Sequence, residues 1–244
     1  MKKQYILLAA LLCIGTLVSA QTSTPAPVQV VEMMYLIPKR GMEEKFETAV
    51  KAHNQKFHPD GPYVAGLRKV EYGKMSGWYV WIFGPTTYSS IDTRPDKENG
   101  HAADWDATVD PLVEKYGTSE LWNYNSDLSF GMDLLKKANF AEFWKVDLKP
   151  GEYYRFKSIA EKVRKASEAV GTMSFVVLEN QIHQTNGSDV GLAWSFNSFK
   201  EWSEDAGMMA AFEKIYGQGT WQNMLNEWRD IVVDYDVEIR KILK

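Results

Sequence analysis

Two stretches of this sequence follow the same order of predicted elements at a separation of about 110 residues. In both, alternating apolar residues predict strands and apolar residues three to four apart predict helices, in the order β-α-β-β-α-β. Five identical pairs stand in register at separations of 110 to 113 residues: Gly41 and Gly151, Phe46 and Phe156, Gly77 and Gly187, Trp81 and Trp194, and Tyr124 and Tyr235. Repetition at a fixed period indicates a duplicated unit. We therefore predict two α+β units, at residues 28–133 and 134–244.

Each unit is expected to contain four strands and at least two helices. The strands are predicted at Val28–Ile37, Val64–Tyr72, Trp78–Phe83 and Leu121–Leu128, and again at Phe140–Leu148, Met173–Gln181, Val190–Phe196 and Ile231–Ile239. The helices are predicted through Phe46, Val50, His53 and Phe57; through Trp105, Val109, Leu112 and Tyr116; from Phe156 to Val170; and at Met208–Tyr216 and Trp221–Trp228. The units differ most before the second helix, where the first unit has a long polar loop, Asp92–Gly100.

Both faces of the predicted sheets are apolar. In one strand Trp78, Val80 and Ile82 alternate with Tyr79, Trp81 and Phe83, and side chains alternate between the faces of a strand. Helices cover only one face of a β-α-β-β-α-β unit, so a single unit would leave an apolar face bare. We expect a tandem ferredoxin-like fold in which two antiparallel sheets pack face to face as a pseudo-dimeric α+β barrel within one chain.

This arrangement resembles the dimeric α+β barrel superfamily, which includes antibiotic-biosynthesis-type monooxygenases, EthD-like proteins and NIPSNAP-like proteins. In those proteins two ferredoxin-like units pack sheet to sheet, as a dimer or as a tandem in one chain. The resemblance spans about residues 28–240 as a pattern of elements. The resemblance implies the fold of this chain and identifies none of its residues as catalytic.

Residues 1–20 have the features of a secretory signal. Lys2 and Lys3 precede a short apolar run that ends in Val18-Ser19-Ala20, where small side chains suit signal cleavage before Gln21. Residues 21–27 form a polar, proline-bearing leader that we expect to be disordered. We therefore predict a secreted or periplasmic protein.

Cleavage would remove Cys13, the single cysteine, and would change the formal net charge from −4 to −6. A chain without thiols has no disulfide and no thiolate ligand. An acidic chain lacks the basic surface that nucleic acid requires, and no later apolar run is long enough for a membrane span. A small-molecule ligand is compatible with this composition, and the oligomeric state stays open.

The candidate site lies in the first unit. His53 falls on the apolar face of its helix, where the second unit has Val163, and His101 follows the polar loop on a helical stripe with Trp105. We expect a pocket lined by His53, Tyr35, Trp81 and Trp105 and closed by residues 92–101. The alternatives are a core histidine bonded to the backbone for His53 and a plain helix-start residue for His101.

Other polar residues are expected to face solvent. His58 lies in a turn rich in proline and glycine, and His183 lies beside a hairpin. Asp234, Asp236 and Glu238 alternate along the last strand and predict a solvated face, with the lining of a polar cavity as the alternative. The sequence contains no HExxH motif, and we assign no metal site.

Three classes of function fit these features. We expect a protein that binds a small apolar or aromatic molecule in a pocket of the first unit and needs no cofactor. The superfamily resemblance implies the main alternative, a monooxygenase that is cofactor-independent or haem-dependent, with His101 as a candidate haem ligand. A non-catalytic scaffold or interaction module is the third class.

Overall fold

The computed structural model describes residues 27–94, 99–183 and 187–244. The predicted signal at residues 1–20 and nearly all of the leader at 21–27 lie outside the described residues, as does part of the polar loop. The strands are β1 (Gln29–Pro38), β2 (Ala65–Tyr72), β3 (Tyr79–Thr87), β4 (Val113–Tyr124), β5 (Phe140–Leu148), β6 (Val176–Asn180), β7 (Val190–Phe196) and β8 (Val232–Leu243). The helices are α1 (Glu43–Phe57), α2 (Tyr88–Asp92), α3 (His101–Thr108), α4 (Met132–Lys137), α5 (Tyr153–Val170), α6 (Phe199–Ser203), α7 (Met208–Tyr216) and α8 (Thr220–Ile231).

The strands form one closed antiparallel barrel in the order β1-β3-β2-β8-β5-β7-β6-β4. The strands of the first half are contiguous in the order β4-β1-β3-β2, and those of the second half follow the matching order β8-β5-β7-β6. The halves are joined edge to edge, because β2 pairs with β8 and β4 pairs with β6. Full closure leaves neither half with an unpaired sheet edge.

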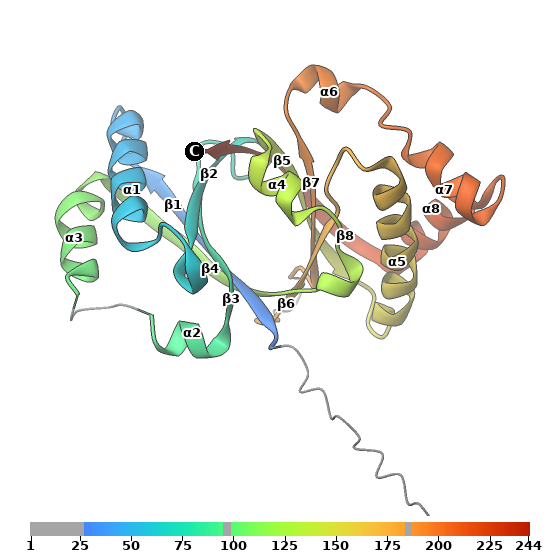
Figure 1. The fold of residues 1–244 in the computed structure, drawn as a ribbon, viewed down its shortest axis with the longest axis horizontal. Coiled ribbons are helices and arrows are strands. Elements are labelled where there is room, and N and C mark those ends of the chain that lie inside the picture. Colours follow the sequence, from blue (N-terminus) through green and yellow to red (C-terminus); the bar gives the residue numbers. More distant parts are fainter. Residues whose placement is uncertain (1–26, 95–98, 184–186) are drawn as a thin grey trace, which may run out of the picture.

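Helices cover the barrel on two opposite sides (Figure 1). On one side α1 packs on the first half, where Phe46 and Val50 meet Leu36 and Tyr79 from the strands. On the other side α5, α7 and α8 pack on the second half around Phe156, Phe212 and Met224. The apolar stripe of each helix is thus buried against the outer face of its own half.

The alternation predicted for the third strand is confirmed. Val80 is buried in the barrel interior with Trp78 and Ile82 packed beside it, whereas Tyr79, Trp81 and Phe83 are buried on the outer face under α1. The interior cluster combines residues of both halves, including Val31 and Phe143. The described residues therefore form three apolar clusters, one inside the barrel and one beneath each set of helices.

The predicted second helix of the first unit is partly wrong. α3 ends at Thr108, a short 3-10 turn covers Asp110–Leu112, and β4 begins at Val113. Pro111 cannot donate the backbone hydrogen bond that a continuing helix needs. Tyr116 instead lies in β4 opposite Leu36 of β1. The predicted end of that strand is also a 3-10 turn, at Ser126–Leu128.

The sequence did not predict α4, which follows β4 and precedes β5. Its residues Met132 and Leu135 pack against the interior cluster of the barrel. Among the described residues, no helix has the length and apolarity needed to cross a bilayer.

Candidate metal centre

Three histidines of the first unit converge at the side of the barrel. His53 lies one turn before the end of α1, His58 follows directly after that helix, and His101 is the first residue of α3. The Nε2 atom of His101 lies 3.2 Å from Nε2 of His53 and 2.9 Å from Nε2 of His58. One ligand nitrogen from each ring lies within 4.8 Å of those of the other two.

The outer nitrogens of two rings are held by groups that fix their tautomers. Nδ1 of His58 lies 2.7 Å from the carbonyl oxygen of Tyr63, which can only accept, so this Nδ1 carries the proton. Nδ1 of His53 lies 2.9 Å from Oδ2 of Asp104. In their neutral forms both rings therefore direct the lone pair of Nε2 toward His101.

Asp104 is itself oriented by a cation. Lys56 donates to Oδ1 of Asp104 at 2.7 Å, and Oδ2 contacts His53. The hydrogen bonds from Lys56 and, second, from His53 lower the pKa of Asp104. An ionised carboxylate behind an imidazole fixes the ring orientation and increases the basicity of its other nitrogen.

Burial keeps His58 in the form that can bind a metal. Desolvation is the main cause that lowers its pKa to about 4, so the ring is neutral at neutral pH. His53 is only 1% exposed and His58 only 4%. His101 is more exposed and lies on the solvent side of the cluster.

Aromatic rings enclose the cluster. The ring of Trp105 lies 5.0 Å from that of His53, and the ring of Trp81 lies 5.3 Å from that of His58. Phe57 packs against both His53 and His101. The indole nitrogen of Trp81 donates to Asn54 at 3.0 Å, which fixes that ring against α1. The three imidazoles are therefore bordered by aromatic rings, with the Asp104 carboxylate behind His53 and solvent beside His101.

These distances suit a bound metal ion. Two nitrogens at about 2.0–2.1 Å from a tetrahedral zinc ion lie about 3.3 Å apart. The two spacings to His101 are 3.2 and 2.9 Å, and the ligand nitrogens of His53 and His58 lie within 4.8 Å of each other. Without a metal, the single Nε2 position of His101 faces two lone pairs and can donate only one proton between them. A cation at this point would be attracted by all three nitrogens.

The structure brings most of the predicted site residues together and excludes one. His53, His101, Trp81 and Trp105 all contact the cluster. Tyr35 does not, because it points from the opposite face of β1 into the barrel, where it receives a hydrogen bond from Arg240. A surface hollow does border His53, but it lies between α1 and α3 beside Lys56 and Asp104, and none of the predicted aromatic residues lines it.

His58 corrects another expectation, because it is buried rather than solvated. Asp104 was missed, although its spacing of three residues from His101 places both on one face of a helix. The sequence did not predict a metal site either, because the three histidines come from separate segments that only the fold brings together. His183 is exposed, as expected.

The second half fills the equivalent region with apolar side chains. Val163, at the position that corresponds to His53, packs with Met208 and the buried Phe212. The histidine cluster thus distinguishes the first half from the second.

No protein-family model matches the chain, and no curated protein matches it. Solved structures do match. A "putative monooxygenase" from Lactobacillus acidophilus NCFM has a TM-score of 0.57 at 13% identity and covers 89% of this chain and 95% of its own. Another, from Fusobacterium nucleatum subsp. nucleatum, has a TM-score of 0.59 at 13% identity, covering 89% and 94%. A chlorite dismutase from Candidatus Nitrospira defluvii has a TM-score of 0.51 at 7% identity, covering 90% and 93%.

The chain therefore shares its fold, the dimeric α+β barrel, with these structures. The resemblance is one of fold alone, since the identities are low and a shared fold does not establish a shared function.

The surroundings of His101, the candidate haem ligand, do not fit a porphyrin. Nε2 of His101, the atom that would bind the iron, lies within 3.2 Å of two other imidazole nitrogens. Phe57 packs on the ring of His101 as well. A porphyrin could reach this nitrogen only by displacing His53 and His58. The arrangement favours a single ion bound by three imidazoles over haem bound by one.

Proposed function

We propose that this protein is a histidine-ligated metalloprotein that binds one divalent transition-metal ion through Nε2 of His53, His58 and His101. The observation that carries the proposal is the convergence of three Nε2 atoms, two of them with their Nδ1 atoms held by Asp104 and the Tyr63 carbonyl. Imidazole ligands suit zinc, copper, iron and nickel, whereas magnesium and calcium prefer oxygen.

Three protein ligands leave a coordination position open. Structural zinc sites usually have four protein ligands, while catalytic sites have three and bind water or substrate in the remaining position. The partial exposure of His101 supports an open position on the solvent side. We propose that a small molecule reaches the metal on this side. The small-molecule site expected in the first unit would then be the open position of the metal.

Metal binding to mature protein tests the proposal. We expect one Zn²⁺ ion per chain by titration calorimetry and elemental analysis, and a tetrahedral visible spectrum after loading with Co²⁺. His58→Ala should bind Zn²⁺ at least one hundred times more weakly, because it removes one of the three ligands and alanine has no atom that can bind the metal.

His183→Ala is the matched control, because it removes an exposed histidine far from the cluster in sequence. It should bind as the natural chain does. If the natural chain retains no metal, or if His58→Ala retains it fully, the proposal is wrong and a non-catalytic scaffold becomes the better interpretation.

Oxygen-dependent oxidation of an aromatic substrate at this centre is a second candidate. It is favoured by the ring-lined surroundings of the cluster and by the monooxygenase descriptions of two solved neighbours. Oxygen uptake with a polyphenol should occur with copper- or iron-loaded protein and be absent with zinc. Equal uptake by His58→Ala would count against a role for the metal.

We also propose that the mature chain is exported and begins at Gln21. The charged start, the short apolar run and the small residues before Gln21 support this. The intact mass of protein from the native host should lack residues 1–20, and retention of Met1 to Ala20 would contradict export by this route.

A further inference from the structure

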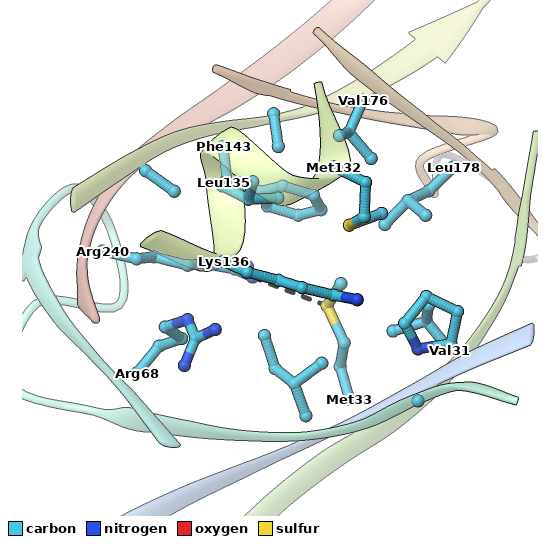
Figure 2. A pocket seen from close by; sticks show the side chains of 15 residues that line it. Val31, Met33, Arg68, Met132, Leu135, Lys136, Phe143, Val176, Leu178 and Arg240 are labelled. Atoms are coloured by element: carbon cyan, nitrogen blue, oxygen red, sulfur yellow. Dashed lines mark hydrogen bonds between the residues drawn. The ribbon is translucent and has the colours of Figure 1, made fainter. Parts of the chain in front are cut away.

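The barrel interior also contains unfilled space, which is separate from the histidine cluster. A cavity of about 110 Å³ lies between the strands and α4. Figure 2 shows Met132, Phe143 and Leu178 pointing into it. Most of its wall is apolar, and Leu135 of α4 adds to that wall. Lys136, also on α4, lines the cavity and is exposed, so it marks the rim.

Arginines form the polar part of this wall. Arg68 from β2 and Arg240 from the neighbouring strand β8 both line the cavity. Burial and, second, the charge of Arg240 lower the pKa of Arg68 to about 10, so Arg68 is still protonated at neutral pH. Two arginines therefore face one small, largely apolar space, with Lys136 at its rim.

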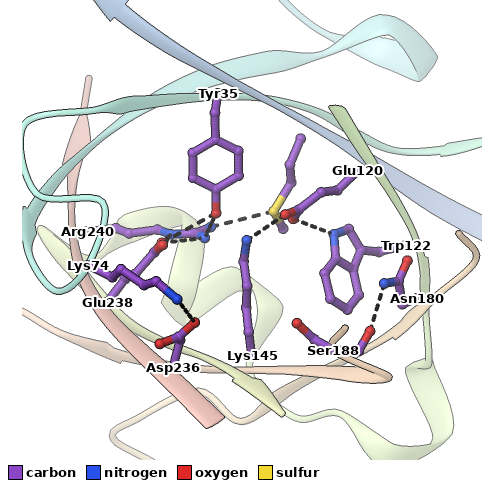
Figure 3. Close-up of polar contacts among 11 residues, drawn as sticks. Tyr35, Lys74, Glu120, Trp122, Lys145, Asn180, Ser188, Asp236, Glu238 and Arg240 are labelled. Atoms are coloured by element: carbon purple, nitrogen blue, oxygen red, sulfur yellow. Dashed lines mark hydrogen bonds and ion pairs between the residues drawn. The ribbon is translucent and has the colours of Figure 1, made fainter. Parts of the chain in front are cut away.

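Only one of these arginines has a carboxylate partner. Arg240 contacts Oε2 of Glu238 at 2.7 Å and donates to the hydroxyl of Tyr35 at 2.6 Å, as Figure 3 shows. Lys145, the other interior cation in that network, pairs with Glu120. Within the described ranges, no carboxylate forms an ion pair with Arg68, which donates instead to the carbonyl of its neighbour Leu67 at 3.0 Å.

The charges inside the barrel are therefore unbalanced. Arg68, Lys145 and Arg240 supply three positive charges, and Glu120 and Glu238 supply two negative ones. A buried charge without a counter-ion is costly, and a like charge nearby increases that cost. A bound anion at Arg68 would supply the missing negative charge.

We propose that the barrel cavity binds a small monocarboxylate with a single apolar group, its carboxylate on Arg68 and its apolar part among Met33, Met132, Phe143 and Leu178. Guanidinium and carboxylate groups match in shape and form paired hydrogen bonds. The apolar wall selects an organic acid over an inorganic anion, because chloride or sulfate would gain nothing from it.

The volume sets the size of the ligand. An apolar cavity of about 150 Å³ accommodates benzene, and this one is somewhat smaller, with additional space toward its rim. The ligand is thus an acid with one aromatic ring or an aliphatic chain of about four to six carbons. A two-ring acid is too large.

Titration of the mature protein with benzoate tests the proposal directly. We expect one benzoate per chain, at least tenfold weaker binding of the neutral isostere benzamide, and no binding of 1-naphthoate. Arg68→Gln should weaken benzoate binding at least tenfold and leave benzamide binding unchanged. Arg229→Gln, at an exposed arginine on α8, is the matched control and should bind benzoate normally.

Several results would overturn the proposal: equal affinity for benzoate and benzamide, unchanged benzoate binding in Arg68→Gln, or chloride binding as tightly as benzoate. Failure of both benzoate and butyrate to bind at millimolar concentration would do the same. The comparison of acid and amide uses the natural chain, so it stands even if a variant fails to fold. Benzoate binding should persist in His58→Ala, which separates this site from the proposed metal centre.

Discussion

At the scale of single residues, the two arginines that line the cavity differ in whether a carboxylate balances their charge. Arg240 belongs to a buried pair with Glu238, both almost fully shielded from solvent. Arg68, one strand away, has the backbone carbonyl of Leu67 as its hydrogen-bond acceptor. The same substitution at the two positions should therefore have opposite effects on the free energy of unfolding.

Arg240→Met should destabilise the fold by about 3–5 kcal/mol, because it leaves the carboxylate of Glu238 buried without its partner. Arg68→Met should be neutral or stabilising by about 1 kcal/mol, because it removes a partly buried charge that has no counter-ion. Urea denaturation in ligand-free buffer measures both. A large loss of stability in Arg68→Met would mean that Arg68 has a structural partner.

Asp104 provides a test of the support behind the metal ligands. Asp104→Asn keeps the shape but removes the charge that holds His53, and loss of such a partner typically weakens metal binding about 10–100-fold. Zinc titration measures the change. Asp106→Asn, at an exposed position of the same helix, is the control and should bind zinc normally. Equal affinities in the two variants would exclude a positioning role for Asp104.

Single residues also show how much of the candidate site could be predicted from the sequence. His53 could be identified because a histidine replaces valine on an apolar helix face. His58 and Asp104 could not, since their partners lie 43 to 51 residues away and depend on the turn after α1. Glu238 was expected in solvent because its strand alternates polar residues, yet it lies inside the barrel with Arg240. Alternation defines the two faces of a strand but does not say which face a closed barrel encloses.

At the scale of elements, strand pairing holds the halves together. The end of β8 pairs with β2 through Leu243, Ile242 and Lys241, and this pairing closes one of the two seams between the halves. The predicted last strand ended at Ile239, so the sequence pattern missed the residues that make this seam. Arg240 and Lys241 are two consecutive charged residues, and they interrupt the alternating pattern on which a strand is recognised.

Removal of residues 241–244 should therefore open the barrel at β2. The truncated chain should lose several kcal/mol of stability, on the order of the buried apolar area that Ile242 contributes plus the lost ladder hydrogen bonds. It should also self-associate through the bare edge of β2. Thermal unfolding and size-exclusion chromatography measure the two effects. A monomer as stable as the natural chain would show that this seam contributes little.

At the scale of the whole molecule, each half depends on the other. The barrel interior combines residues of both halves, and two inter-half seams leave no open sheet edge. The repeat in the sequence predicted two units of matching element order, and the strand orders agree with it. We propose that the units at 28–133 and 134–244 arose by duplication and that only the first kept, or gained, the histidine cluster.

Neither half should fold as a monomer when expressed alone. Each would expose its share of the interior cluster and two strand edges, which favours dimers or aggregates. Analytical ultracentrifugation of the two fragments checks this, with the full mature chain as the control. Two well-folded monomeric fragments would show that the halves are independent domains.

Anomalous diffraction tests the proposed metal centre most directly. Crystals of mature protein grown with equimolar Zn²⁺ should give one strong peak at the zinc absorption edge, at about 2.0–2.1 Å from Nε2 of His53, His58 and His101. A fourth ligand, water or a small molecule, should complete the tetrahedron. Absence of a peak at these nitrogens, or a peak only at exposed positions such as His183, would contradict the proposed metal centre.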